Sequence, residues 1–197
     1  SFLIPGLVMV TLAQNAFANS SSSILQSKMN GNIVFMLLAP LSSLEVYIAF
    51  LGAAILRGLI TGGSVLLIAS LLVDVEIYSV GLILLFALLA SGVLGALGII
   101  AGIWSEKYDH LSAFQNFIIL PLTFLSGVFF SIQGLSPFWQ QVSAWNPVFY
   151  LIDGFRYGFL GVSDVPYLQS VWVALLFLVM LTGISVAILR SGYKLRG

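Results

Sequence analysis

The stretch NPVFYLIDGFRYGFLG, residues 146–161, places two opposite charges inside an otherwise apolar and aromatic run. Asn146 followed by Pro147 is a strong helix-start signal, because an asparagine side chain caps the helix and proline is tolerated at the first helical position. In such a helix Asp153 and Arg156 are neighbours on one face, three positions apart. A charge at the centre of a bilayer costs roughly 2.5 to 3.5 kcal/mol, so we expect the two side chains to neutralise each other.

The length of this helix indicates that it does not cross a membrane. From Pro147 to Leu160 it spans about 21 Å, whereas the hydrocarbon core of a bilayer is about 30 Å thick. Ser136-Pro137 is a second helix start of the same design. We therefore expect re-entrant helices over about 136–160, with Asp153 and Arg156 as a structural clamp or, alternatively, an outer gate.

The composition is that of a membrane protein. Of 197 residues, 60% are hydrophobic and 7% are charged, and the mean hydropathy is +1.11, whereas about a quarter of the residues of a soluble domain are charged. Seven basic and seven acidic residues cancel, so no net charge attracts nucleic acid. The chain has no cysteine, which excludes disulfides, zinc-thiolate sites and thiol catalysis.

Five windows are apolar enough for a spanning helix of about 20 residues. They are 6–27, 47–73, 78–104, 113–132 and 168–190. If the C-terminus is cytoplasmic, one basic residue, Arg156, lies outside and five lie inside, as the positive-inside rule requires. Those five are Lys28, Lys107, Arg190, Lys194 and Arg196.

With this orientation residue 1 lies outside, so we expect one further span before it. The predicted fold is an all-α, multi-pass bundle of six helices in the cell membrane, of which five are present, in a single transmembrane domain over 1–197. Small residues at four-residue spacing, such as Gly58 and Gly62 or Gly98 and Gly102, predict close helix packing, and Pro121 predicts a bend in the fourth window.

Two polar features interrupt the apolar windows. Thr11, Asn15, Asn19, Ser22 or Ser23, and Gln26 fall on one helical face, which either makes interhelical hydrogen bonds or lines a polar cavity. Arg57 lies about ten residues inside the second window with no acidic residue one turn away, so its partner must be on another helix or in water. A structural bond and a pathway role both stay open for it.

The segment NGNIVFMLLAPLSSLEV, residues 30–46, is too short to cross a membrane. We expect a surface helix over 33–39, ended by Pro40. We expect this helix to be either an interfacial anchor or a docking element for a cytoplasmic partner. The docking alternative follows because water solvates exposed apolar side chains poorly unless a partner covers them.

The sequence lacks the patterns of common enzymes. No lysine follows a glycine in a G-x-x-x-x-G-K-[ST] phosphate loop, and no Ser-His-Asp set or pair of carboxylates on a common face is present. We therefore expect no catalytic, cofactor or metal site, and predict that the chain is not an enzyme by itself.

Four segments together resemble the type-2 permease family of ABC transporters, over nearly the whole chain. They are FLIPGLVMV near the start, LLAPLSSLEV, LPLTFLSGVFFSI at 120–132, and SPFWQQVSAWNPVFYLIDGFRYGFLG. The resemblance implies a six-helix permease of the bacterial inner membrane that forms a dimer, a homodimer in the simplest case. It also implies two copies of an ATP-binding cassette subunit, which hold ATP and magnesium.

In that family the segment matching 32–43 is a coupling helix on the ATPase, and the stretch matching 133–161 forms external re-entrant helices. The resemblance thus assigns ATPase coupling to Ile33, Phe35, Leu38 and Pro40. The second cytoplasmic loop, with Glu106 and Lys107, offers a charged second contact.

The leading functional hypothesis is export of an amphipathic substrate, such as a drug, lipid or glycolipid, through the dimer interface. We expect four residues to face the pathway, from the polar stripe and from the aromatic run beside Pro121: Asn15, Asn19, Phe117 and Phe124. The alternatives are a glycan or lipid-linked polysaccharide exporter of the same family, and a channel or secondary transporter that works without ATP.

Overall fold

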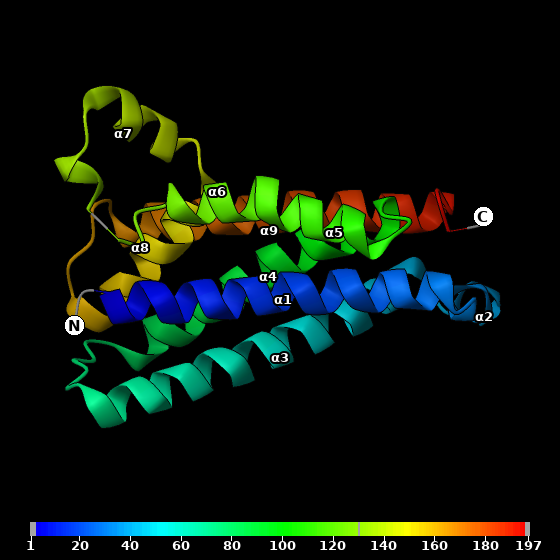
Figure 1. The fold of residues 1–197 in the computed structure, drawn as a ribbon, viewed down its shortest axis with the longest axis horizontal. Coiled ribbons are helices and arrows are strands. Elements are labelled where there is room, and N and C mark those ends of the chain that lie inside the picture. The colour runs from blue at the N-terminus through cyan, green and yellow to red at the C-terminus, as the bar shows by residue number, and fades with distance from the viewer. Residues whose placement is uncertain (1–2, 130, 196–197) are drawn as a thin grey trace.

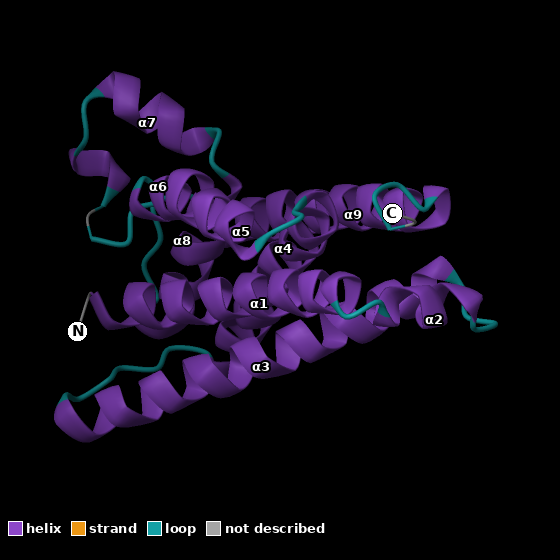
Figure 2. Ribbon diagram, turned by 45° about the vertical axis from the view of Figure 1, so that its right-hand side comes forward, coloured by secondary structure: helices purple, strands orange, loops and turns teal. Residues whose placement is uncertain are grey.

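The computed structural model describes residues 3–129 and 131–195, and every regular element in these ranges is a helix (Figures 1 and 2). Four helices are long: α1 (Leu3–Met29), α3 (Ser43–Leu72), α4 (Val80–Trp104) and α9 (Tyr167–Ser191). The shorter ones are α2 (Asn32–Leu38), α5 (Tyr108–Phe114), α6 (Leu120–Phe124), α7 (Pro137–Ala144) and α8 (Pro147–Leu160). A π-helical segment, η1 (Gln115–Ile119), joins α5 to α6, and a 3₁₀ turn, η2 (Ile132–Gly134), precedes α7.

The helix α4 lies at the centre of the bundle, in contact with α1, α3, α8 and α9. In its most apolar window 72% of the residues are buried, against 11% for α3 and 17% for α9. The bundle has two distinct ends (Figure 1). One end, which we call the α2 end, holds α2 and the C-terminus, and the other, the α8 end, holds α7, α8 and the N-terminus.

Three of the described helices, α3, α4 and α9, are long and apolar enough to cross a membrane. Together with α1, their bounds lie within four residues of the windows 6–27, 47–73, 78–104 and 168–190. The helix α1 is equally long but carries the polar stripe, so its assignment as a span stays a prediction, as does the total of six spans.

The window 113–132 was placed too far along the chain. The helical segment begins at Tyr108 and ends at Phe124, three residues before Gly127, which adopts a left-handed φ of 78°. The regular α-helix already gives way to the π-helical segment just before Pro121. Apolar composition alone cannot show this break, since the residues after it are as apolar as those before it.

Small residues allow the close contacts that the sequence predicted. A Cβ atom on Gly102 would lie 2.7 Å from the Ser21 carbonyl oxygen of α1, and one on Gly58 would lie 3.1 Å from the Leu12 carbonyl oxygen. Backbones therefore approach directly, and a larger side chain would separate α1 from α4 or α3.

We predict that Gly102→Ala lowers the free energy of unfolding by about 1 to 3 kcal/mol, because its methyl group meets backbone rather than a flexible side chain. Gly52→Ala is the matched control: nothing lies within 4 Å of a Cβ there, so alanine is neutral or adds up to about 1 kcal/mol through its helix propensity. Thermal unfolding of the purified variants in detergent measures both. Equal unfolding midpoints would contradict the packing account.

Candidate functional site

The helix α8 begins and ends where its sequence signals predict. The Asn146 side chain accepts a hydrogen bond from the Val148 backbone N–H at 3.0 Å and donates one to the Leu122 carbonyl oxygen at 2.6 Å. Pro147 occupies the first turn, and Gly161 ends the helix with a φ of 68°. The cap of α8 thereby also holds the end of α6.

Glycines seat α8 deeply against α4. A Cβ atom on Gly154 would overlap the ring of Phe86, and one on Gly158 would lie 2.7 Å from Ile83 Cγ1. The Gly158 carbonyl oxygen also accepts the Ser79 backbone N–H at 2.8 Å. The four-residue spacing of these two glycines is a known helix-packing motif. The sequence analysis did not identify this motif, although both glycines stand in the stretch 146–161.

Asp153 and Arg156 both bond to loop backbone, and the expected pairing of their charges stays a prediction. The Asp153 carboxylate accepts the backbone N–H groups of Asp164 at 2.8 Å and Val165 at 3.2 Å. The Arg156 guanidinium donates to the Gly127 carbonyl oxygen. Asp153 and Arg156 are both almost fully buried, so each fastens α8 to a different loop.

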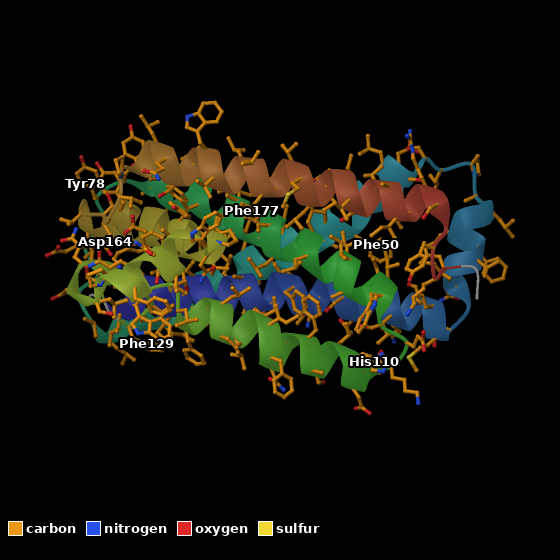
Figure 3. All side chains as sticks on the ribbon, turned by 90° about the horizontal axis from the view of Figure 1, so that it is seen from above. Phe50, Tyr78, His110, Phe129, Asp164 and Phe177 are labelled. Atoms are coloured by element: carbon orange, nitrogen blue, oxygen red, sulfur yellow. The ribbon has the colours of Figure 1, made fainter. Side chains whose placement is uncertain are left out.

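These two residues also line a cavity of about 260 Å³ at the α8 end, together with Ser131, Gln133 and Asp164. Figure 3 labels Asp164 at this end, with Tyr78 and Phe129, and His110 at the opposite end. The contacts of Asp153 and Arg156 describe a structural clamp, and the gate alternative stays a prediction.

The helix α2 presents apolar side chains to the surface at the α2 end. Gly31 precedes it with a φ of 72°, and it ends at Leu38, two residues before Pro40. Phe35 is 73% exposed and Leu38 is 77% exposed, whereas Ile33 is only 4% exposed. Ile33 therefore anchors α2 to the bundle, while Phe35 and Leu38 are available for contact with a partner.

Charged side chains form a cluster at the same end. The Lys194 ammonium group lies 3.2 Å from Glu106 Oε1, and Lys28 donates to the carbonyl oxygens of Ile103 and Ser105 at 2.6 and 2.7 Å. The lysine hydrogen bond lowers the pKa of Glu106 below its ordinary 4.5, and burial lowers the pKa of Lys28. The stabilisation from Glu106 is therefore present above pH 4.5 and is lost as the pH falls through the lowered pKa.

Lys107, the other predicted charged contact in this loop, is exposed beside Glu106. Both residues precede α5, whose first turn follows directly at Tyr108. The loop that holds these two residues lies at the same end of the bundle as α2 (Figure 1).

The polar stripe of α1 is half-buried, and most of its hydrogen bonds return to its own helix. Asn15 donates to the Thr11 carbonyl oxygen at 3.0 Å, and Ser22 donates to the Ala18 carbonyl oxygen at 2.6 Å. The exception is Asn19, whose Oδ1 accepts from Arg57 Nη1 of α3 at 2.9 Å. One of the two alternatives for Arg57, a partner on another helix, is thus realised, and it joins two residues that sequence analysis treated separately.

The two predicted aromatic residues lie on the outside of the chain. Phe117 of η1 is 81% exposed and Phe124 of α6 is about half exposed, stacked on Phe129 with ring centroids 5.8 Å apart. The adjacent helix α5 contacts α1 through the stacked rings of Phe17 and Phe114. No contact in the described residues joins Phe117 or Phe124 to Asn15, so a shared pathway stays a prediction.

Among the described residues, no group of three or more histidine, cysteine, aspartate or glutamate side chains is placed to hold a metal ion. The structure combines an apolar helical bundle, a short buried helix, α8, and an exposed apolar helix, α2, at the same end as a charged loop. It is an all-helical protein in which three of the described helices are long and apolar enough to cross a membrane.

Comparison with known proteins identifies the family. Residues 1–160 match the ABC-2 type transporter family, and the chain belongs to it, which confirms the resemblance found in the sequence. The chain is 35% identical over 195 residues to the inner membrane transport permease YadH of Escherichia coli (strain K12), covering 99% of this chain and 76% of that protein. It is 26% identical over 196 residues to nodulation protein J of Rhizobium leguminosarum bv. viciae, covering 96% and 74%.

We predict that Asp153→Ala lowers the free energy of unfolding by about 1 to 3 kcal/mol, because two backbone N–H groups lose their acceptor. Asp74→Ala removes an exposed acid at the same end of the bundle and is expected to change it by less than about 0.5 kcal/mol. Chemical or thermal unfolding in detergent measures the difference. A variant at position 153 as stable as the one at position 74 would contradict the clamp.

Proposed function

We propose that the chain is the membrane-spanning permease subunit of an ATP-driven exporter that moves an amphipathic molecule, such as a drug, lipid or glycolipid. The observation that carries this proposal is the exposure of Phe35 and Leu38 on α2. Large apolar side chains on the outside of a short helix, outside the long helices, need a protein partner or a membrane surface to cover them. In this family the natural partner is an ATP-binding cassette subunit.

Two copies of that subunit would hold ATP and magnesium and carry out hydrolysis, since the chain itself has no phosphate-binding loop. In this arrangement α2 is the coupling helix, Phe35, Leu38 and Pro40 touch the ATPase, and Ile33 transmits its movement to the bundle. Glu106 and Lys107 supply a second, charged contact next to it.

The proposed orientation puts the α2 end in the cytoplasm of a bacterial cell and the bundle in the inner membrane. Four described basic residues lie at that end: Lys28, Lys107, Arg190 and Lys194. At the α8 end there is one, Arg156, so the positive-inside rule favours this assignment. It also places α7 and α8 on the external side.

There α8 would act as a re-entrant cap. Its Gly154 packs against Phe86, six residues after the first residue of α4, which corresponds to a depth of about 9 Å. The helix is thus sunk into the bundle and does not rest on top of it, and its length supports entry and return rather than a crossing.

The substrate path in this proposal runs between two copies of the permease, most simply a homodimer. Asn15 and Asn19 on the half-buried face of α1, with Phe117 and Phe124, are the proposed lining. The exposed aromatic rings of Phe117 and Phe124 also favour a second candidate, a glycan or lipid-linked polysaccharide exporter, because sugar faces stack on aromatic rings.

The test is purification of the full-length protein from native membranes, followed by mass spectrometry and an ATP hydrolysis assay. We expect an ATP-binding cassette subunit to co-purify and to be lost when Phe35 and Leu38 are both replaced by aspartate. Phe138→Asp is the matched control, since Phe138 is a comparably exposed aromatic residue at the α8 end. It is expected to retain the ATPase.

Absence of any ATPase with the unaltered protein would contradict the proposal and favour a channel or secondary transporter. Retention of the ATPase by the double aspartate variant would leave the family assignment intact but remove α2 as the docking element.

A further inference from the structure

The position of Arg57 in α3 places its charge deep in the membrane. It lies 14 residues after Ser43 and 15 before Leu72, the two ends of the helix, which is about 21 Å from either end. The interface of a ~30 Å hydrocarbon core is about 15 Å from its centre. That distance is longer than an arginine side chain, so Arg57 cannot reach the headgroups by extending along the helix.

The surroundings of Arg57 in the chain do not neutralise it. The residue is exposed, and the one hydrogen bond found for its guanidinium in the described residues goes to the Asn19 amide oxygen at 2.9 Å. A guanidinium has five N–H donors, and a neutral amide supplies no opposite charge. A cation at this depth needs a pairing anion or water.

None of the acidic residues that the structure describes pairs with Arg57. The seven acidic residues of the chain all lie at or near the two ends of the bundle. Glu45, Glu106 and Asp109 belong to the α2 end, and Asp74, Glu76, Asp153 and Asp164 belong to the α8 end. A second copy brings the same seven residues in the same places. Water or a bound anion would satisfy the remaining guanidinium donors, and a bound anion would also balance the charge.

An apolar groove approaches this cation to within one helical turn. It has a volume of about 430 Å³ between α1, α2 and α3, and Glu45 lies at its α2 end. Ser23 on its wall is one turn after Asn19, and Ala53 is one turn before Arg57. Its remaining lining is apolar: Met36, Leu41, Val46, Ala49 and Phe50, the last of which is labelled in Figure 3. The lining of the groove thus reaches to one helical turn from each member of the hydrogen-bonded pair.

We propose that Arg57, oriented by Asn19, binds the anionic group of a transported amphiphile at the middle of the membrane, with the apolar part of that molecule in the groove. The anion is a phosphate, sulfate or carboxylate, each of which matches the planar array of guanidinium donors. This inference rests on the proposed export function and narrows its substrate class to amphiphiles with a negative charge.

The test is equilibrium binding of ³²P-labelled dodecyl phosphate to the purified protein in dodecyl maltoside micelles, where the neutral detergent has the same alkyl chain and is in large excess. We expect saturable binding that weakens by about tenfold or more in Arg57→Gln, since a charge-assisted contact is lost. Arg57→Lys keeps the charge but loses the planar array of donors, so its affinity is expected to lie between those of Arg57→Gln and the unaltered protein. Arg190→Gln, at the last turn of α9, is the matched control and is expected to bind normally.

A second variant keeps the proposal testable if Arg57→Gln fails to fold. Ala53→Trp leaves the cation in place but fills the groove, so it is expected to abolish saturable binding. Unchanged binding in folded Arg57→Gln, or in Ala53→Trp, would overturn the proposal. Competition by phosphatidylglycerol would identify a membrane lipid as the source of the anion, and its failure to compete would identify a soluble amphiphile; the site is supported in both cases.

The binding assay needs neither ATP nor a partner subunit. Loss of the ATPase in the co-purification experiment and loss of dodecyl phosphate binding are therefore separate outcomes. The anion site can fail while the export function stands, and the reverse also holds.

Discussion

Hydrocarbon offers no hydrogen bonds, so every polar group that enters it must find its partner inside the protein. This constraint accounts for most of the structure. Most of the polar side chains of α1 bond to the backbone of their own helix, and Arg57 bonds across to Asn19. The buried charges of α8 bond to loop backbone. Glycines in α4 and α8 let the neighbouring helices pack closely around α4.

The two ends of the bundle differ in the side chains that they present. At the α8 end, buried charges and glycines fix a short helix tightly into the bundle, which suits a cap on the external side. At the α2 end, apolar side chains are left uncovered beside Glu106 and Lys107, which suits a docking surface. Under the proposed function, energy would enter at the α2 end and substrate would leave at the α8 end.

Local signals in the sequence predicted local structure well. Asn146-Pro147 predicted the start of α8, Pro40 followed the end of α2, and residue spacing placed the contacts of Gly58 and Gly102. Such reasoning cannot predict hydrogen-bond partners that are distant in the sequence. The carboxylate of Asp153 is bonded 11 and 12 residues away, and the guanidinium of Arg156 is bonded 29 residues away. Likewise, only the relative rotation of α1 and α3 decides that Asn19 meets Arg57. The lining of the pathway stays a prediction.

The central claim is that the polar face of α1 lies on a water-accessible path rather than against lipid. Because the chain has no cysteine, a single nitroxide label can be attached at Asn15→Cys and, as the lipid-facing reference, at Ile60→Cys on the exposed side of α3. The measurement is the collision rate of each label with a water-soluble nickel complex and with oxygen, in reconstituted membranes containing the assembled transporter. The account predicts that position 15 favours the nickel complex and position 60 favours oxygen. Equal preference for oxygen at both positions would contradict it.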